Sequence, residues 1–240
     1  AVAITAQEAW TSRPGGLKVE IPSYVREVVE EVAFQARADR KIDKRSGVSQ
    51  RLPITTLELA VSNAERRALA NGETLIVPRV TDIYAALPSI TGKFELEYEG
   101  ELRGAEQVAR DLIRSSVGSV FTSLFEGVDA RRVIEWFDLG GSLPLGDGTS
   151  AAEMVKQAHG VQGLGELAQQ AGAAPGAAGP VLASAIDFVL EGLYAQKKIS
   201  RSDERGYSAN AEATPRRAAR REEPADEEIR VPGGKKKYYN

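Results

Sequence analysis

The sequence SGVSQRLPITTLELAVSNAERRALANG, residues 46–72, joins a polar loop containing glycine to the clearest helix pattern in the chain. Apolar side chains recur in it at the three- and four-residue spacing of a buried helix face. This predicted face comprises Leu57, Ala60, Val61, Ala64, Ala68 and Leu69. We expect the helix to begin near Arg51–Pro53, because proline is tolerated in the first turn, and to end at Asn71–Gly72. The stretch therefore predicts a helical fold with a defined boundary between loop and helix.

Helical patterns continue on both sides of this stretch, so the fold class is mainly α. Before it, residues 21–41 carry an apolar stripe made of Tyr24, Val25, Val28, Val29, Val32, Ala33 and Ala36. Further helices are predicted at about 2–11, 80–88, 104–127, 129–139, 149–159, 163–172 and 181–198. The helix at 104–127 is expected to bury Val108, Leu112, Val117, Val120, Phe121, Leu124 and Phe125. Residues 74–77 are β-prone, and the acidic segment 93–104 could form a short strand, a hairpin arm or a polar link.

Composition removes several classes of protein from consideration. The 240 residues are 42% hydrophobic but only 6% aromatic, which disfavours β-rich folds. No cysteine is present, so disulfides, zinc–thiolate sites and iron–sulfur clusters are excluded. The single histidine, His159, rules out a metal site with several histidines and fits a helix C-terminus. A formal net charge of −3 argues against a nucleic-acid-binding protein, and no metal site is predicted.

The chain shows no signal for export or for a membrane. Its first 20 residues lack the basic start and apolar run of a signal peptide. The longest apolar region, 180–195, contains Asp187 and Glu191 and is shorter than the roughly 20 residues that a spanning helix needs. We therefore expect a cytoplasmic protein without a membrane segment.

Residues 198–240 differ from the rest of the chain. They contain few aliphatic side chains and blocks of both charge signs, such as Arg216–Arg217 and Glu222–Glu223. A segment of this composition cannot bury enough apolar surface to offset the entropy lost on ordering. The sequence predicts a disordered, charged C-terminal tail at 198–240.

Gly47, Ser49, Gln50 and Arg51 are the candidate binding residues, all of them in the loop before the helix at 51–71. An arginine in the first turn of a helix can project its fork toward phosphate oxygens, and the helix N-terminus adds free amides and a favourable dipole. On spacing alone, a surface arginine after a turn is the simpler interpretation. No catalytic residue is predicted.

Gly47-Val48-Ser49-Gln50-Arg51 resembles the start of the sensor-2 helix in AAA+ ATPases of the MoxR-like and magnesium-chelatase-like type. The similarity extends to the preceding helix, which ends in ARADRKID (36–43), and to the alanine- and arginine-rich helix that follows. Beyond the apolar step at 75–77, the run VTDIYAALP (80–88) resembles the last helix of the family's lid. The resemblance covers residues 1–93, which would be the small helical lid of such an ATPase.

This resemblance implies a role in ATP hydrolysis. The lid of the family packs over ATP, and Arg51 would be the sensor-2 arginine that contacts the γ-phosphate, with Gly47, Ser49 and Gln50 beside it. ATP and Mg²⁺ would be bound mainly by an N-terminal α/β domain. The family forms homo-oligomeric rings and often acts with a partner that has a von Willebrand factor A domain. Magnesium chelatases insert metal into a porphyrin, whereas MoxR-like relatives act as chaperones or metal-insertion helpers.

The chain departs from the family pattern because its 240 residues contain neither a G-x-x-x-x-G-K-[ST] phosphate loop nor a Walker B strand end. It starts at Ala1, and its only methionine is Met154. We therefore expect the ATP-binding core to lie upstream and this chain to be inactive as an enzyme alone.

The predicted organisation is a lid at 1–93, a helical extension at 94–197 and the tail. No ligand set for a tetrapyrrole is present, which favours a chaperone-like role over chelation. The alternative is a free-standing helical interaction or regulatory module without ATPase activity.

Overall fold

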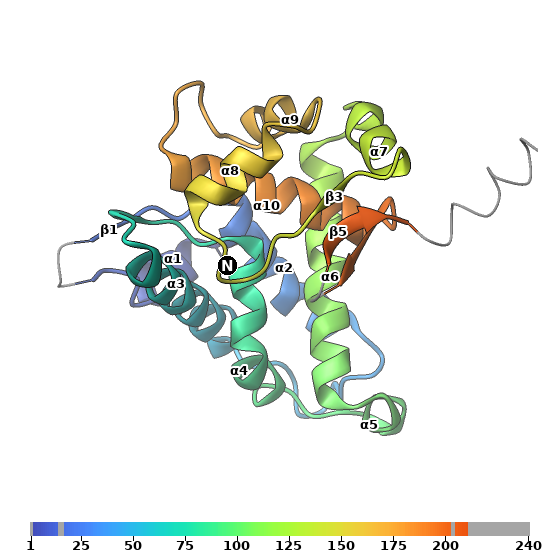
Figure 1. Cartoon of the computed structure of the whole chain (residues 1–240). Helices are drawn as coiled ribbons and strands as arrows, with labels where there is room; N and C mark the ends of the chain where they lie inside the picture. The colour runs from blue at the N-terminus through green and yellow to red at the C-terminus, as the bar shows by residue number, and fades with distance from the viewer. Residues whose placement is uncertain (1, 14–16, 203–204, 211–240) are drawn as a thin grey trace, which may run out of the picture. The chain divides into compact units, whose positions relative to one another are not determined.

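The computed structural model describes residues 2–13, 17–202 and 205–210, and this part of the chain is mainly helical (Figure 1). Its ten α-helices and one 3₁₀ helix (η1) are α1 Val2–Glu8, α2 Ser23–Ala38, α3 Arg51–Asn71, η1 Val80–Ala86, α4 Leu87–Thr91, α5 Tyr98–Arg103, α6 Ala105–Leu124, α7 Arg131–Asp138, α8 Ala151–Ala158, α9 Leu164–Gln170 and α10 Gly179–Ala195. None of the helices in these ranges is both long and apolar enough to cross a membrane.

Short strands join segments that are distant in the sequence. They are β1 Lys18–Val19, β2 Leu75–Ile76, β3 Ser142–Leu143, β4 Ile199–Ser202 and β5 Gly206–Ala209. The first two pair in parallel, with Lys18 opposite Leu75, and so bring the segment before α2 next to the end of α3. The other three form an antiparallel sheet in the order β3-β5-β4.

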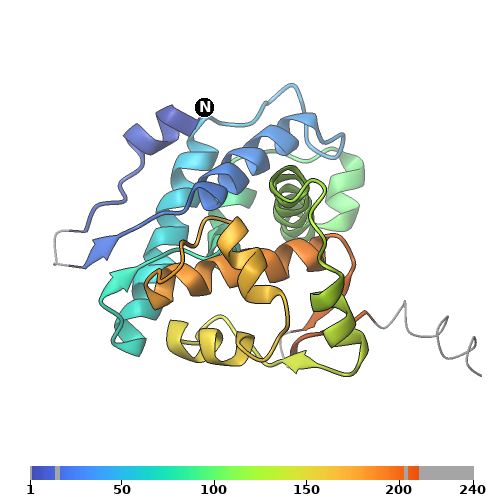
Figure 2. The same cartoon turned by 90° about the horizontal axis from the view of Figure 1, so that it is seen from above.

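Helix α10 lies at the centre of the fold. Figure 2 shows this helix, in orange, between α2 on one side and α8 on the other, with α9 lying over it in this view. Every residue from Ala183 to Leu193 is buried, including the two acids of the helix. A helix that is apolar nearly all round is stable in water only when neighbours cover all its faces. Helices α6, α8 and α9, the 3₁₀ helix η1 and strand β4 pack directly against α10.

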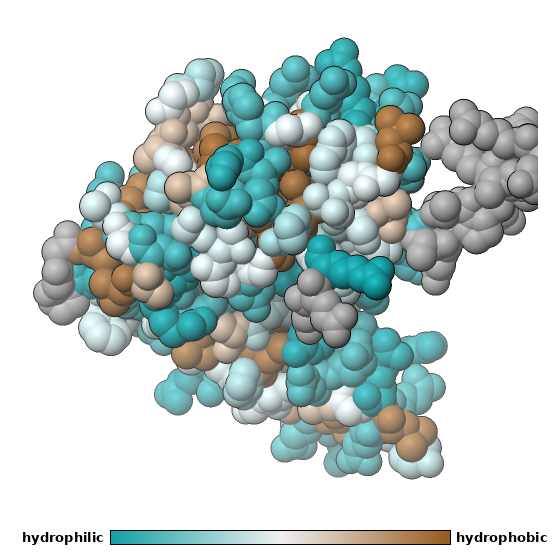
Figure 3. Space-filling model, viewed as in Figure 1, coloured by the Kyte–Doolittle hydropathy of each residue, from teal (hydrophilic) through white to brown (hydrophobic). Residues whose placement is uncertain are grey.

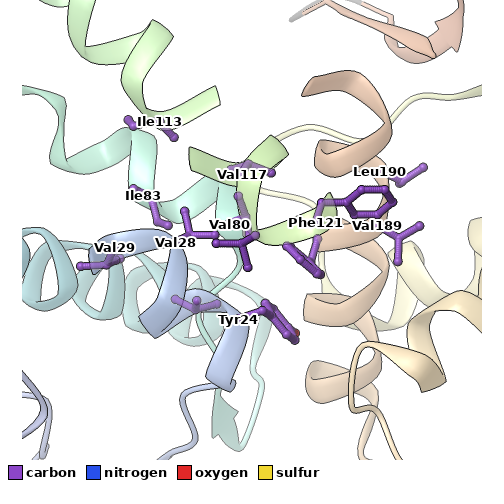
Figure 4. Packing of buried hydrophobic residues seen from close by; sticks show 14 of the residues in the cluster. Tyr24, Val28, Val29, Val80, Ile83, Ile113, Val117, Phe121, Val189 and Leu190 are labelled. Carbon is purple, nitrogen blue, oxygen red and sulfur yellow. The ribbon is translucent and has the colours of Figure 1, made fainter. Parts of the chain in front are cut away.

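The hydrophobic core continues across residue 93, the predicted junction of lid and extension. Tyr24 of α2 stacks on Phe188 of α10, with ring centroids 4.5 Å apart. Figure 4 shows side chains of α2, η1, α6 and α10 meeting in this region, among them Val28, Val80 and Phe121. At Gly192 of α10 an added Cβ would overlap the Phe121 ring, so only glycine permits this close approach of α6. Helices from both predicted parts therefore share one core.

Most predicted helices are confirmed. Helix α3 begins at Arg51 and ends, as predicted, before Gly72, which adopts a left-handed conformation with φ of 66°. The entire predicted stripe of α2 is buried. Two predicted core positions are wrong: Leu69 of α3 is 64% exposed and Leu124, the last residue of α6, is 40% exposed.

The prediction that the disordered tail begins at residue 198 is wrong. Residues Ile199–Ser202 and Gly206–Ala209 pair as β4 and β5, and Tyr207 is buried. Local composition offers little sign of these strands, because their pairing depends on β3 and on contacts with α10, both distant in sequence. The remainder of the predicted tail, 211–240, lies outside the described residues.

The acidic segment at 93–104 consists of two parts, a bridge to another segment and a short helix. Leu96 forms an isolated antiparallel bridge with Ile42, and Tyr98–Arg103 then form α5. The bridge joins this segment to the loop between α2 and α3. Of the interpretations left open by the sequence, the polar link describes the segment best, with one helical turn at its end.

Candidate functional site

The four candidate binding residues lie on the surface where the loop enters α3. Gly47 has φ of 71°, a left-handed conformation that favours glycine, and its N–H donates to the Asp43 carbonyl at 3.3 Å. The Ser49 hydroxyl accepts a hydrogen bond from the Arg51 backbone N–H at 3.2 Å. Gln50 is the residue before the helix, and its side chain makes no capping hydrogen bond. The loop is also held from a distance, because the Ser49 N–H donates to the Lys93 carbonyl at 3.4 Å.

Arg51 is the first residue of α3, and its side chain is exposed. Within the described residues its guanidinium has no hydrogen-bond or ion-pair partner. The next two residues, Leu52 and Pro53, are buried and fix the first turn of the helix against the core. The result is a cation with unused donors on a rigid support, which is suited to an external anion.

A second group of polar residues is buried between α3, η1 and α10, and it was missed by the sequence predictions. Its first part is the ion pair between Arg67 and Asp82, whose side chains are only 3% and 2% exposed. The Asp82 carboxylate also accepts hydrogen bonds from Asn63 Nδ2 at 2.8 Å and from the Arg79 N–H at 2.7 Å. Arg67 Nη2 donates to the Val77 carbonyl at 2.9 Å. These bonds hold the start of η1 against α3.

The second part of the group is an acid pair one helical turn apart on α10, Asp187 and Glu191, each 1% exposed. Asp187 accepts hydrogen bonds from the Thr81 N–H and hydroxyl at 3.1 and 3.0 Å. Glu191 accepts from Arg201 Nη1 at 2.8 Å and from the Tyr207 hydroxyl at 2.7 Å. One carboxylate therefore holds η1, and the other holds the β4–β5 pair.

Burial and repulsion between the two carboxylates raise the pKa of Asp187. Burial first, and then the charge of Glu191, raise the pKa of Asp187 from 3.8 to about 6, although Arg79 and the Thr81 N–H oppose the shift. Burial and the Glu191 charge also raise the pKa of Tyr207 well above its usual range, so its hydroxyl remains a donor. The carboxylates and their donors thus satisfy one another, which gives the group a structural role.

One signal in the sequence could have revealed this group. Asp187 and Glu191 interrupt an apolar run at a spacing of four residues, so both fall on the same face of α10. A buried carboxylate requires partners, and acids within an apolar helix therefore predict basic and hydroxyl groups nearby. The identity of those partners, Arg201 and Tyr207 among them, depends on the tertiary fold.

The other polar candidates do not assemble into a metal site. The described residues contain no group of three or more His, Asp or Glu side chains that could hold a metal ion. His159 is the C-cap of α8, as the sequence predicts. The alternating acids at 95–101 are divided between the Leu96 bridge segment and α5.

Comparison with known proteins yields no relative: no protein-family model, curated protein or solved structure matches the chain. The geometry of the residues themselves must therefore support any functional assignment.

Proposed function

We propose that this chain is the lid and helical extension of an AAA+ ATPase of the magnesium-chelatase or MoxR type. In this proposal it couples ATP binding and hydrolysis to remodelling of a partner protein or to metal insertion. The observation that carries the proposal is Arg51: an exposed arginine at the first position of a 21-residue helix, after a loop with a left-handed glycine. The resemblance of this loop to the sensor-2 pattern adds support from the sequence.

The proposed role of Arg51 is to contact the γ-phosphate of ATP bound by a neighbouring nucleotide-binding domain. Its guanidinium presents a planar set of donors that fits phosphate oxygens, and the positive end of the α3 helix dipole adds positive potential. The Ser49 hydroxyl positions the Arg51 backbone at the helix start. Loss of the γ-phosphate would remove the partner of Arg51 and release the lid.

The buried polar group gives a route by which a movement of α3 would reach the rest of the chain. Arg67 and Asp82 join α3 to η1, and Thr81 and Asp187 join η1 to α10. The first link is buried and the second is part-buried, and each resists independent motion of the two elements it joins. We infer that α3, η1 and α10 would move together when the nucleotide state changes.

ATP and Mg²⁺ fit this proposal to different degrees. The exposed guanidinium of Arg51 is suited to a phosphate group, whereas the described residues offer no carboxylate cluster for a metal. The proposal therefore assigns Mg²⁺ and most ATP contacts to a domain with a phosphate loop. Bound ATP supplies the phosphoryl-transfer reaction, and the residues of this chain sense its terminal phosphate. Assembly into a homo-oligomeric ring and action with a von Willebrand factor A partner are further parts of the proposal.

The test is the steady-state ATP turnover of the ATPase that contains this chain, measured for Arg51→Ala and for Arg45→Ala. Arg45 is an exposed arginine of the same loop and provides the matched control. We expect Arg51→Ala to lower turnover by at least about tenfold, as loss of a charged contact to the transferred phosphate would. Arg45→Ala should retain normal turnover. Equal turnover in the two variants, with both folded by circular dichroism, would contradict the proposal.

A free-standing interaction module is the second candidate, and exposed apolar side chains favour it. Tyr98 and Leu102 of α5 are 72% and 73% exposed, and they lie one turn apart on the same face. Figure 3 shows the corresponding apolar area over α5. Leu139, at the end of α7, is 90% exposed. The turnover measurement separates the candidates, because a module without ATPase activity gives Arg51 no role that Arg45 lacks.

A further inference from the structure

A polar cleft of about 520 Å³ lies between α3, η1, α6, the end of α10, β4 and the loop before α8. Its volume is in the range of small-molecule sites. Arg66 of α3 lines it and lies about 22 Å from Arg51, measured along the helix at the usual 1.5 Å per residue. The cleft is therefore separate from the proposed γ-phosphate contact.

Four arginines from three elements line this cleft: Arg66 of α3, Arg110 and Arg114 of α6, and Arg201 of β4. Only two acids, Asp111 and Asp147, line it with them, which leaves a formal excess of two positive charges. In the view of Figure 3 the surface over α6, below the β4–β5 pair, is mainly hydrophilic. Arginines that converge on one concave surface are the usual feature of an anion site.

The donors of these arginines are only partly used. Arg66 donates to the amide oxygen of Asn63 at 2.8 Å and has no carboxylate partner among the described residues. Arg114 contacts Asp111 at 3.4 Å, a long distance, while Asp111 is already held by Arg103 at 2.5 Å and by Gln107 at 3.0 Å. These two arginines can therefore turn toward a ligand at little cost, because exposed ion pairs are weak.

The other two arginines have acidic partners of different accessibility. Arg110 pairs with Glu106 of the same helix at 2.8 Å, and both side chains are largely exposed. The Arg201 side chain is 17% exposed, and the carboxylate of the buried Glu191 holds its guanidinium in place. Its second contact, to Asp147 at 3.2 Å, involves a carboxylate that is 68% exposed and lies on a loop. An incoming anion could replace Asp147 at Arg201 without disturbing the buried group.

We propose that this cleft binds a small phosphate-bearing anion. The guanidinium groups of Arg66 and Arg114 bind the anion. Arg201, held in place by Glu191, forms the bottom of the site. Phosphate is favoured over a single carboxylate because its three or more oxygens can accept from several forks at once. Asp147 acts as a competing partner that keeps Arg201 paired when no ligand is bound. The site is independent of the ATPase proposal.

The proposal is tested by calorimetric titration of the full 240-residue chain with inorganic pyrophosphate, phosphate and malonate. We expect pyrophosphate to bind more tightly than malonate and more weakly as salt concentration rises. Arg66→Gln combined with Arg114→Gln should weaken pyrophosphate binding by at least about tenfold, since two charged contacts are lost. Asp147→Asn should tighten it severalfold because the competing carboxylate is removed. Adenosine diphosphate in parallel shows whether a nucleoside adds affinity to the phosphate contacts.

The matched control is Arg131→Gln combined with Arg132→Gln, which removes two exposed arginines at the start of α7, outside the cleft. This variant should bind pyrophosphate as the wild type does. Three results would overturn the proposal: no binding to the wild type, an equal loss in the α7 control, or malonate binding as tight as that of pyrophosphate. Circular dichroism establishes that each variant is folded, so a loss of binding cannot be attributed to unfolding.

Discussion

Arg51 and Arg67 carry the same guanidinium on the same helix in opposite environments. Arg51, at the first position of α3, is exposed and has no side-chain partner among the described residues. Arg67, more than four turns later, is 3% exposed and pairs with Asp82. Arg51 can therefore bind an external group, whereas the guanidinium of Arg67 is already bound within the fold. Burial and partners, and not residue type, therefore separate a candidate site from a structural contact.

The largest expected effect on the free energy of unfolding comes from replacing Arg67, the buried arginine of the two. Arg67→Ala leaves the Asp82 carboxylate buried without its cation, which should lower the free energy of unfolding by about 3–5 kcal/mol. Arg51→Ala should change it by no more than about 0.5 kcal/mol, as is usual for an exposed position. Urea unfolding of the two variants measures both values. Similar losses in the two variants would contradict the assignment of a structural role to Arg67 alone.

A matched double variant sharpens this prediction. Arg67→Met combined with Asp82→Asn removes both charges and keeps similar volumes. It should therefore recover part of the stability lost in Arg67→Ala, because no unpaired charge remains. If the double variant is less stable than Arg67→Ala, the loss arises from packing and not from the isolated carboxylate.

A smaller effect is expected from pH, through Asp187. Its pKa in the folded protein, about 6, is higher than its ordinary value of 3.8, so between these values the folded state binds more protons than the unfolded state. The free energy of unfolding should therefore fall as pH rises through this window, by about 1–3 kcal/mol from this group. Asp187→Asn carries no titrating group here.

The measurement for this prediction is urea unfolding of wild type and Asp187→Asn at about pH 4.5 and about pH 7. The stability of the variant relative to wild type should increase with pH. A relative stability that is constant, or that decreases with pH, would show that Asp187 is ionised without penalty in the folded protein.

The smallest effect concerns the cap at the exposed end of α3. Ser49→Ala removes the hydroxyl that accepts from the Arg51 N–H, and should lower the free energy of unfolding by about 0.5–1 kcal/mol. Ser123→Ala, at an exposed position late in α6, is the control and should have little effect. A loss of several kcal/mol for Ser49→Ala would mean that the loop also has a tertiary role.

The sequence was a good guide wherever the controlling residues are neighbours. Helix α3 begins and ends where the sequence predicts, at Arg51 and before Gly72. The apolar stripe of α2 is buried as predicted, because periodic spacing alone decides which side of a helix faces the core. Leu69 shows the limit: it belongs to the predicted face of α3, but it is 64% exposed because no element of the described residues covers it.

Predictions failed where distant segments decide the structure. Residues 199–209 looked like the start of a charged tail, yet Arg201 and Tyr207 are the partners of Glu191 on α10. Local composition could not reveal this, because the buried carboxylate that stabilises the two strands lies on another element. The cleft arginines were missed for the same reason: Arg66, Arg114 and Arg201 converge only after α3, α6 and β4 are packed together.

The sequence by itself determined the helical class, the position of α3 and the candidate loop at Gly47–Arg51. These features depend on spacing, capping and glycine conformation, which act over a few residues. Only the tertiary structure decided which charges are buried, which are free and which face the same cleft. The energy of a charge depends on every group packed around it, and most of those groups are far away in the sequence.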